Sequence, residues 1–115
     1  MNEFITLFLV LIGLHCIADY PLQGDFLANG KDLTNPLPSI PWYQCMLAHC
    51  SIHGLFVGIA LQDPFLGIIE FLAHFYIDCL KCVKVFNYNQ DQFLHIFCKL
   101  MWIAIYMLIH SGGAA

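Results

Sequence analysis

The chain has 115 residues, of which 60% are hydrophobic and only 10% are charged, and its formal net charge is -4 at pH 7. Its mean hydropathy of +0.73 lies far above the range of water-soluble domains and excludes an ordinary soluble protein. Lysine and arginine together number only 4, which excludes a nucleic-acid-binding surface. The composition therefore predicts an integral membrane protein.

Four apolar stretches are each close to the ~20 residues that cross a bilayer core of about 30 Å as a helix. They cover approximately residues 3–20, 42–61, 64–85 and 91–110. The predicted fold class is all-α, a polytopic membrane four-helix bundle with up-down-up-down topology. The whole chain, residues 1–115, is expected to be one transmembrane domain.

Residues 21–41 form the one long connection and are expected to be an interfacial loop. Pro21 and Gly24 close the first helix. Within the loop, residues 22–28 are expected to form a short interfacial turn that ends at Asn29-Gly30, where the glycine suits a left-handed cap.

The other two connections are short, and each contains a capping signal. Asp63 and Pro64 have the form of an N-cap followed by proline at the first helical position. The second and third helices are therefore expected to form a tight antiparallel hairpin. Asn89 and Gln92 have the spacing of a capping box at the start of the fourth helix.

The few cations predict an orientation. Lys31 lies in the first connection, and Lys81 and Lys84 follow at the end of the third helix. Because cytoplasmic segments are enriched in lysine and arginine, both termini are expected to be periplasmic. Lys99 lies two turns inside the fourth helix and has no role in this scheme.

Each apolar stretch carries two potential metal ligands four residues apart, which places both side chains on one face of a helix. In alternating helices, all four pairs fall in the same, cytoplasmic half of the membrane. A four-helix bundle can bring such pairs to one point, as ferritin-like proteins do. The predicted ligands are His15 and Asp19, His49 and His53, His74 and Asp78, and Asp91 and His95.

Five imidazoles and three carboxylates suit either two metals, or one metal whose histidines are oriented by carboxylates. The predicted cofactor is a divalent metal, one or two ions, with zinc as the first choice and manganese or iron compatible. The alternative is a buried polar network that fixes helix register. Asp91 has a second explanation, because the helix dipole favours a carboxylate in a first turn. Glu70 continues the stripe of His74 and is a further ligand, a proton acceptor or a partner of Lys99.

Several of these motifs together resemble a known family. They are the run from His15 to Asp25, His49-x-x-x-His53, His74-x-x-x-Asp78-x-x-Lys81 and Asp91-Gln92-x-x-His95. In this order they are similar to the domain of unknown function 3307 family of small membrane proteins from bacteria and their phages. The resemblance implies a multi-pass protein of the bacterial inner membrane. It adds four positions of interest, namely Gln23, Asp25, Lys81 and Gln92.

A metal beside carboxylates at the headgroup level has the minimum equipment for hydrolysing an ester or phosphoester. A looser similarity in size and histidine/aspartate usage to membrane-bound metal-dependent hydrolases implies the same reaction. Asp19 and Asp78 would be ligands or general bases, and Lys81 would suit a phosphate. The substrate would be a lipid or lipid-linked molecule that enters from the membrane.

Two other functions are open. One is a phage or bacterial interaction module that binds a host membrane protein and uses the metal or polar network structurally. The other, less favoured, is a metal or proton transporter, which would need more polar residues in the outer half of the membrane. A homo-oligomer is compatible with the Gly54-x-x-x-Gly58 motif, which resembles a helix-dimerisation signal. The six cysteines are expected to be small apolar core residues.

Overall fold

The computed structural model describes residues 2–113, which form five α-helices and no strand. The helices are α1 (Glu3–Asp19), α2 (Gly24–Gly30), α3 (Trp42–Leu61), α4 (Pro64–Cys82) and α5 (Tyr88–Gly113). The prediction of an all-α chain is confirmed. The four-helix up-down-up-down topology is not confirmed, and residues 24–30 form a short fifth helix within the predicted interfacial loop.

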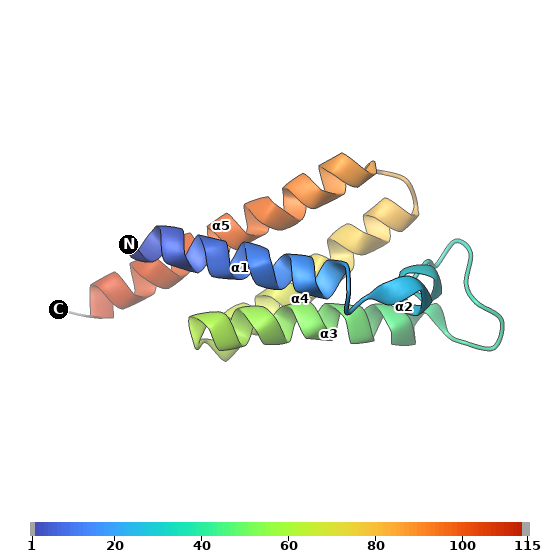
Figure 1. The fold of residues 1–115 in the computed structure, drawn as a ribbon, viewed down its shortest axis with the longest axis horizontal. Coiled ribbons are helices and arrows are strands. Elements are labelled where there is room, and N and C mark those ends of the chain that lie inside the picture. The colour runs from blue at the N-terminus through green and yellow to red at the C-terminus, as the bar shows by residue number, and fades with distance from the viewer. Residues whose placement is uncertain (1, 114–115) are drawn as a thin grey trace.

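The four long helices lie along an elongated molecule of 55 × 24 × 22 Å. α1 and α4 each pack against both α3 and α5, and the most extensive contact is between α3 and α4. Figure 1 shows that the start of α1 and the end of α5 lie at one end of the molecule, while α2 and the long loop that follows it lie at the other. Residues from all four long helices therefore surround a common interior.

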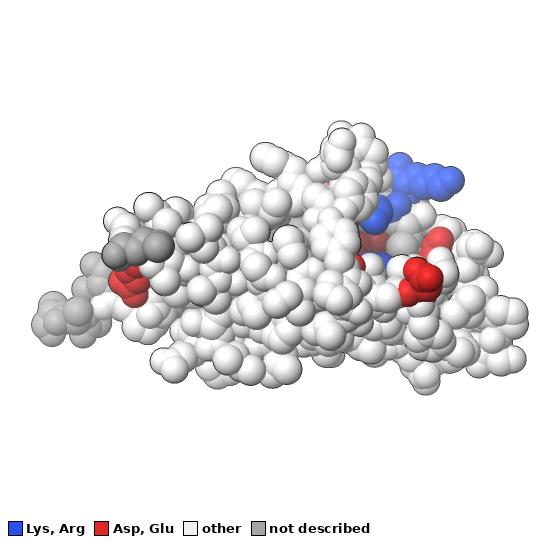
Figure 2. All heavy atoms as spheres, in the orientation of Figure 1, with Lys and Arg blue, Asp and Glu red and all other residues white. Residues whose placement is uncertain are grey.

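The surface suits a lipid environment. Large apolar side chains more than half exposed occur on every long helix, including Leu9, Leu55, Leu72 and Phe93. Figure 2 shows one acidic patch near the start of α1 and both acidic and basic side chains toward the end that holds α2 and the α4–α5 connection, and the middle of this face is uncharged. An uncharged apolar band between two polar ends is the pattern of a membrane protein.

Two helices, α3 and α5, are long and apolar enough to cross a membrane, and α1 with α2 is a third candidate if this bent pair is one span. Three charged residues, Glu70, Asp78 and Lys81, make α4 less apolar. The structure thus supports two or three spans, and a crossing by all four long helices stays a prediction.

The capping prediction for α4 is confirmed, and that for α5 is wrong by two residues. The Asp63 side chain accepts hydrogen bonds from the backbone N–H groups of Phe65 and Leu66 at 3.0 and 3.3 Å. At α5 the reciprocal pair is Asn87 and Gln90, whose side chains each accept from the other's backbone N–H at 2.8 and 3.0 Å. Because α5 begins earlier than predicted, Gln92 is not part of the cap, and its side chain enters the interior of the bundle.

The chain turns sharply between α1 and α2, whose axes differ by 82°. The residue with a left-handed backbone is Gly24, at φ +61°, rather than Gly30 as predicted. Gly30 is needed for another reason: a Cβ at this position would lie 2.5 Å from Cys45 Sγ. Close packing of α2 on α3 therefore requires a residue without a side chain at position 30.

Three glycines allow α3 and α4 to approach closely. A Cβ on Gly67 would lie 2.7 Å from the Gly54 carbonyl oxygen and 3.0 Å from Gly58 Cα. The Gly54-x-x-x-Gly58 motif therefore serves a contact within the chain, and it gives no support for a dimer.

The interior is divided in two along its length. The half near the chain termini is filled by an apolar core composed of Leu11, Val57, Leu61, Leu66, Trp102 and Ile103. The half near α2 holds the polar residues described below. All six cysteines are free thiols; Cys45 and Cys50 are buried as expected, but Cys16 is exposed, so the core prediction is wrong there.

Candidate metal centre

The structure brings all eight predicted ligands together in the half of the interior near α2. Each long helix supplies one pair: α1 gives His15 and Asp19, α3 gives His49 and His53, α4 gives His74 and Asp78, and α5 gives Asp91 and His95. Seven of the eight are buried, and the Asp19 side chain is only 9% exposed. Side chains four residues apart on each helix meet because the four faces point inward. That these residues hold a metal stays a prediction.

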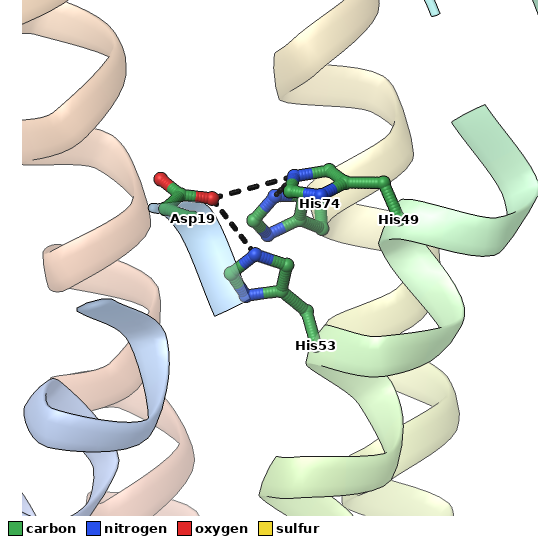
Figure 3. Close-up of side chains that lie close together, drawn as sticks. All are labelled: Asp19, His49, His53 and His74. Atoms are coloured by element: carbon green, nitrogen blue, oxygen red, sulfur yellow. Dashed lines mark hydrogen bonds and ion pairs between the residues drawn. The ribbon is translucent and has the colours of Figure 1, made fainter. Parts of the chain in front are cut away.

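Four of them form one compact group, Asp19, His49, His53 and His74, whose ligand atoms all lie within 4.8 Å of one another. Figure 3 shows the three imidazoles and the carboxylate pointing toward a common centre. Asp19 Oδ1 lies 2.8 Å from His53 Nε2 and 3.3 Å from His49 Nε2. The Nε2 atoms of His49 and His74 are 3.2 Å apart.

These separations fit a single small ion. Ligand atoms bound to a tetrahedral zinc at about 2.0–2.1 Å lie about 3.4 Å from one another. The contact between two Nε2 atoms is a hydrogen bond only if one of them carries a proton, whereas both lone pairs can be used by a metal. The group of four is therefore compatible with a closed tetrahedral site of three imidazoles and one carboxylate.

A second group consists of His74, Asp78 and His95, so the two groups share His74. Asp78 Oδ1 lies 2.9 Å from His95 Nε2, and Asp78 Oδ2 lies 3.5 Å from His74 Nε2. Asp91 Oδ1 is beside this group, 3.3 Å from His95 Nε2. Three ligands with a carboxylate nearby are the pattern of a catalytic zinc site, which keeps a position open.

The five imidazoles are oriented alike. Each directs its Nε2 toward other members of the cluster. His15 Nε2 lies 3.3 Å from Asp19 Oδ2. The Nδ1 atoms of His15, His49 and His95 are buried without a hydrogen-bond partner among the described residues. Three of these imidazoles, those of His49, His53 and His74, converge with Asp19 on one interior point, an arrangement that a bound cation would stabilise.

Gln92 connects the outer members of the cluster. Its Oε1 accepts from His15 Nε2 at 3.0 Å, and its Nε2 donates to Asp19 Oδ2 at 2.9 Å and to Asp91 Oδ2 at 3.3 Å. Because an amide oxygen only accepts, the His15 Nε2 proton is committed to this bond. His15 and Asp91 accordingly lie outside both compact groups, as members that support the ligands.

Lys31 is the residue that sequence reasoning missed. Its Nζ donates to Asp78 Oδ2 at 2.7 Å, and its side chain is only 11% exposed. Burial alone would lower the pKa of Lys31, but the attraction of Asp78 outweighs burial and raises it above 10.5. The sequence placed Lys31 in a loop, and only the bend of α2 explains how it reaches the interior.

Lys81, the predicted catalytic lysine, does not enter the cluster. Its Nζ lies 5.1 Å from the centre of the Tyr88 ring. The Tyr88 hydroxyl is hydrogen-bonded to that of Tyr20, at the end of α1. Of the other positions suggested by the family resemblance, Gln23 donates to the backbone carbonyl of Asp19 at 3.0 Å, and Asp25 is exposed.

A buried ion pair lies next to the cluster on the side of the apolar core. Glu70 pairs with Lys99 and also accepts from Trp102 Nε1 at 3.3 Å. The other carboxylate oxygen of Glu70 is 3.4 Å from His74 Nδ1. Of the three roles considered for Glu70, the pairing with Lys99 is the one the structure shows, and it leaves this pair electrically neutral.

Comparison with known proteins gives one match. The family model described as "Protein of unknown function (DUF3307)" matches residues 6–113. No curated protein and no solved structure matches the chain, so the similarity to membrane-bound metal-dependent hydrolases is not shown. The match covers nearly the whole chain, including every residue of the cluster, and the chain therefore belongs to the DUF3307 family.

Proposed function

We propose that the protein binds one divalent metal ion inside the membrane and uses it to hydrolyse a lipid or lipid-linked ester or phosphoester. The observation that carries the proposal is the convergence of three imidazoles and one carboxylate from α1, α3 and α4 on one buried point, with Asp78 and His95 beside it. Hydrogen bonding alone would not require so many Nε2 atoms to face one another. A polar network built only for packing would pair them with donors and acceptors elsewhere.

The charge of the cluster supports a single divalent ion. Asp19, Asp78 and Asp91 bring three negative charges, and Lys31 returns one positive charge. With neutral imidazoles, two negative charges remain in an apolar interior, which is strongly unfavourable. One divalent cation neutralises them, whereas two would leave an excess of positive charge.

The ligand types favour zinc, with manganese and iron as compatible ions. The group around Asp19 offers four ligands and suits a closed site, while the group around Asp78 offers three and suits an open one. Hydrolysis requires an open position, so Asp19 would have to give up its place to a carbonyl or phosphoryl oxygen of the substrate, which the ion held by His49, His53 and His74 would polarise.

Asp91 is the carboxylate best placed to accept a proton from water. Its Oδ1 is buried without a hydrogen bond among the described residues, whereas Asp19 and Asp78 each accept from several partners. Lys81, beside Tyr88, is available to an anionic headgroup near the same end of the helices. The apolar outer surface would let a lipid approach from the membrane.

The test uses the purified protein, reconstituted with zinc into vesicles of bacterial lipids, with lipid composition followed by mass spectrometry. The reaction is expected to stop in H53A together with loss of the metal. In D91N it is expected to stop while the metal remains bound. H110A is the matched control, because His110 lies outside the cluster and is hydrogen-bonded within its own helix, to the backbone carbonyl of Tyr106. No lipid change in the wild type would contradict the hydrolase assignment.

A structural metal in an interaction module is the second candidate, and one observation favours it. The four-ligand group is complete, and its three histidines are at most 1% exposed, which leaves little room for a substrate. On this alternative the wild type binds metal without lipid turnover. A conduit is less well supported, because the apolar core fills the rest of the interior.

A further inference from the structure

Lys31 places a positive charge beside the three-ligand group of the cluster. Its Nζ lies 2.7 Å from Asp78 Oδ2, one oxygen of the carboxylate in the three-ligand group. The other oxygen of Asp78 faces His95 at 2.9 Å. The ammonium group thus neutralises Asp78 and occupies the side of it that a second ion would need.

The fold holds Lys31 in this place by specific contacts. The Lys31 backbone N–H donates to Leu27 at 3.0 Å and closes α2, and its carbonyl faces Cys82 Sγ at 4.0 Å. Gly30 packs closely on Cys45, since an added Cβ would lie 2.5 Å from its Sγ, and this contact places α2 directly against α3. The short helix that the sequence did not predict therefore has a clear consequence, which is to deliver one cation to the cluster.

The contact between Lys31 and Asp78 determines how many divalent ions balance the charge of the cluster. With Lys31 in place, one divalent ion neutralises the three aspartates of the cluster. Without Lys31, one divalent ion leaves a net negative charge and two leave a net positive charge of the same size. Asp78, His95 and Asp91 would then offer a second ion one imidazole and two carboxylates, while His74 stays with the first.

We infer that Lys31 is a tethered cation that takes the place of a second metal ion and restricts the cluster to one. The inference rests on the proposed metal site and concerns how many ions that site binds. Lys31 is accordingly a positioning residue for the site, because it acts through Asp78 and contacts no ion.

The experiment loads the detergent-purified protein with manganese and measures bound manganese and its electron paramagnetic resonance spectrum. K31Q removes the charge, and K31M removes it with a similar chain length in case glutamine prevents folding. K31R retains the charge. K84Q is the control, because Lys84 is exposed in the connection between α4 and α5.

Wild type, K31R and K84Q are expected to bind about one manganese with the spectrum of an isolated ion. K31Q or K31M is expected to bind about two, with the spectrum of an exchange-coupled pair, which adventitious surface binding does not produce. One manganese in the folded charge-free variants, or two in the wild type, would overturn the inference and leave the metal site standing. A wild type that binds none would overturn the metal site, and the inference with it.

Discussion

Replacing Asp78 by asparagine tests whether the negative charge of the Asp78 carboxylate stabilises the fold through its buried ion pair with Lys31. Asp78 is 3% exposed and lies within 3.5 Å of Lys31, His49, His74 and His95. Removing one partner of a buried ion pair costs about 3–5 kcal/mol, because the other charge is left uncompensated. Since Lys31 retains slight exposure, we expect D78N to lower the free energy of unfolding by about 3 kcal/mol.

The assay is equilibrium unfolding in mixed micelles with a chelator present, so that a bound metal does not contribute. D25N is the matched control, because Asp25 is exposed on α2 and its substitution should change stability by less than about 0.5 kcal/mol. K31Q removes the other charge of the pair and should itself be destabilising, since it leaves Asp78 unpaired.

The double variant D78N/K31Q measures the interaction directly. Because neither charge remains, it is expected to be less destabilised than the sum of the single variants by about 1–3 kcal/mol. Additivity within about 0.5 kcal/mol would refute the reasoning, as would a D78N protein as stable as the wild type.

Three further predictions concern packing, pH and metal. G67A should destabilise the protein by about 1–3 kcal/mol, because its Cβ would lie 2.7 Å from the Gly54 carbonyl oxygen. G13A, with nothing within 4 Å, should instead stabilise α1 by about 0.5–1 kcal/mol, and equal effects in unfolding assays would contradict the packing described. The pKa of Lys31 is raised above its ordinary 10.5, so its contribution to stability is complete below that pH and is lost as pH rises through the higher folded value. K31R should not lose stability at alkaline pH in this way. A Lys31-dependent loss of stability between pH 8 and 10 would contradict the ion pair. Chelation should lower the unfolding free energy by about 4 kcal/mol relative to protein with metal at a thousandfold excess over Kd, and an unchanged value would contradict metal binding.

The four-residue spacing of the ligand pairs predicted that these side chains would meet, because spacing on a helix is local information; that they hold a metal stays a prediction. Ligands four residues apart must share a helix face, and short connections force neighbouring helices to run back along one another. α3 has the predicted boundaries, Trp42–Leu61, and the Asp63 cap forms as expected. Hydropathy likewise predicted the apolar exterior, because lipid-facing residues need no partner within the chain.

The features that sequence reasoning missed all depend on contacts between distant segments. A seven-residue helix such as α2 is too short to show a periodic pattern, and its place is set by Gly30 against Cys45. The approach of Lys31 to Asp78 joins residues 47 positions apart and follows from that packing. Gln92 was interpreted as a capping residue, because two adjacent segments, Asn87–Gln90 and 89–92, offer the same capping pattern.

The most direct test of a metal centre is the metal content of the purified protein. Elemental analysis would compare the wild type with the double variant H49A/H53A, which removes two ligands of the four-ligand group, and with H110A, which removes the one histidine outside the cluster. The predicted result is about one equivalent of zinc, manganese or iron in the wild type and in H110A, and almost none in the folded double variant. A folded wild type that holds no metal and takes up none when it is added would contradict the metal centre.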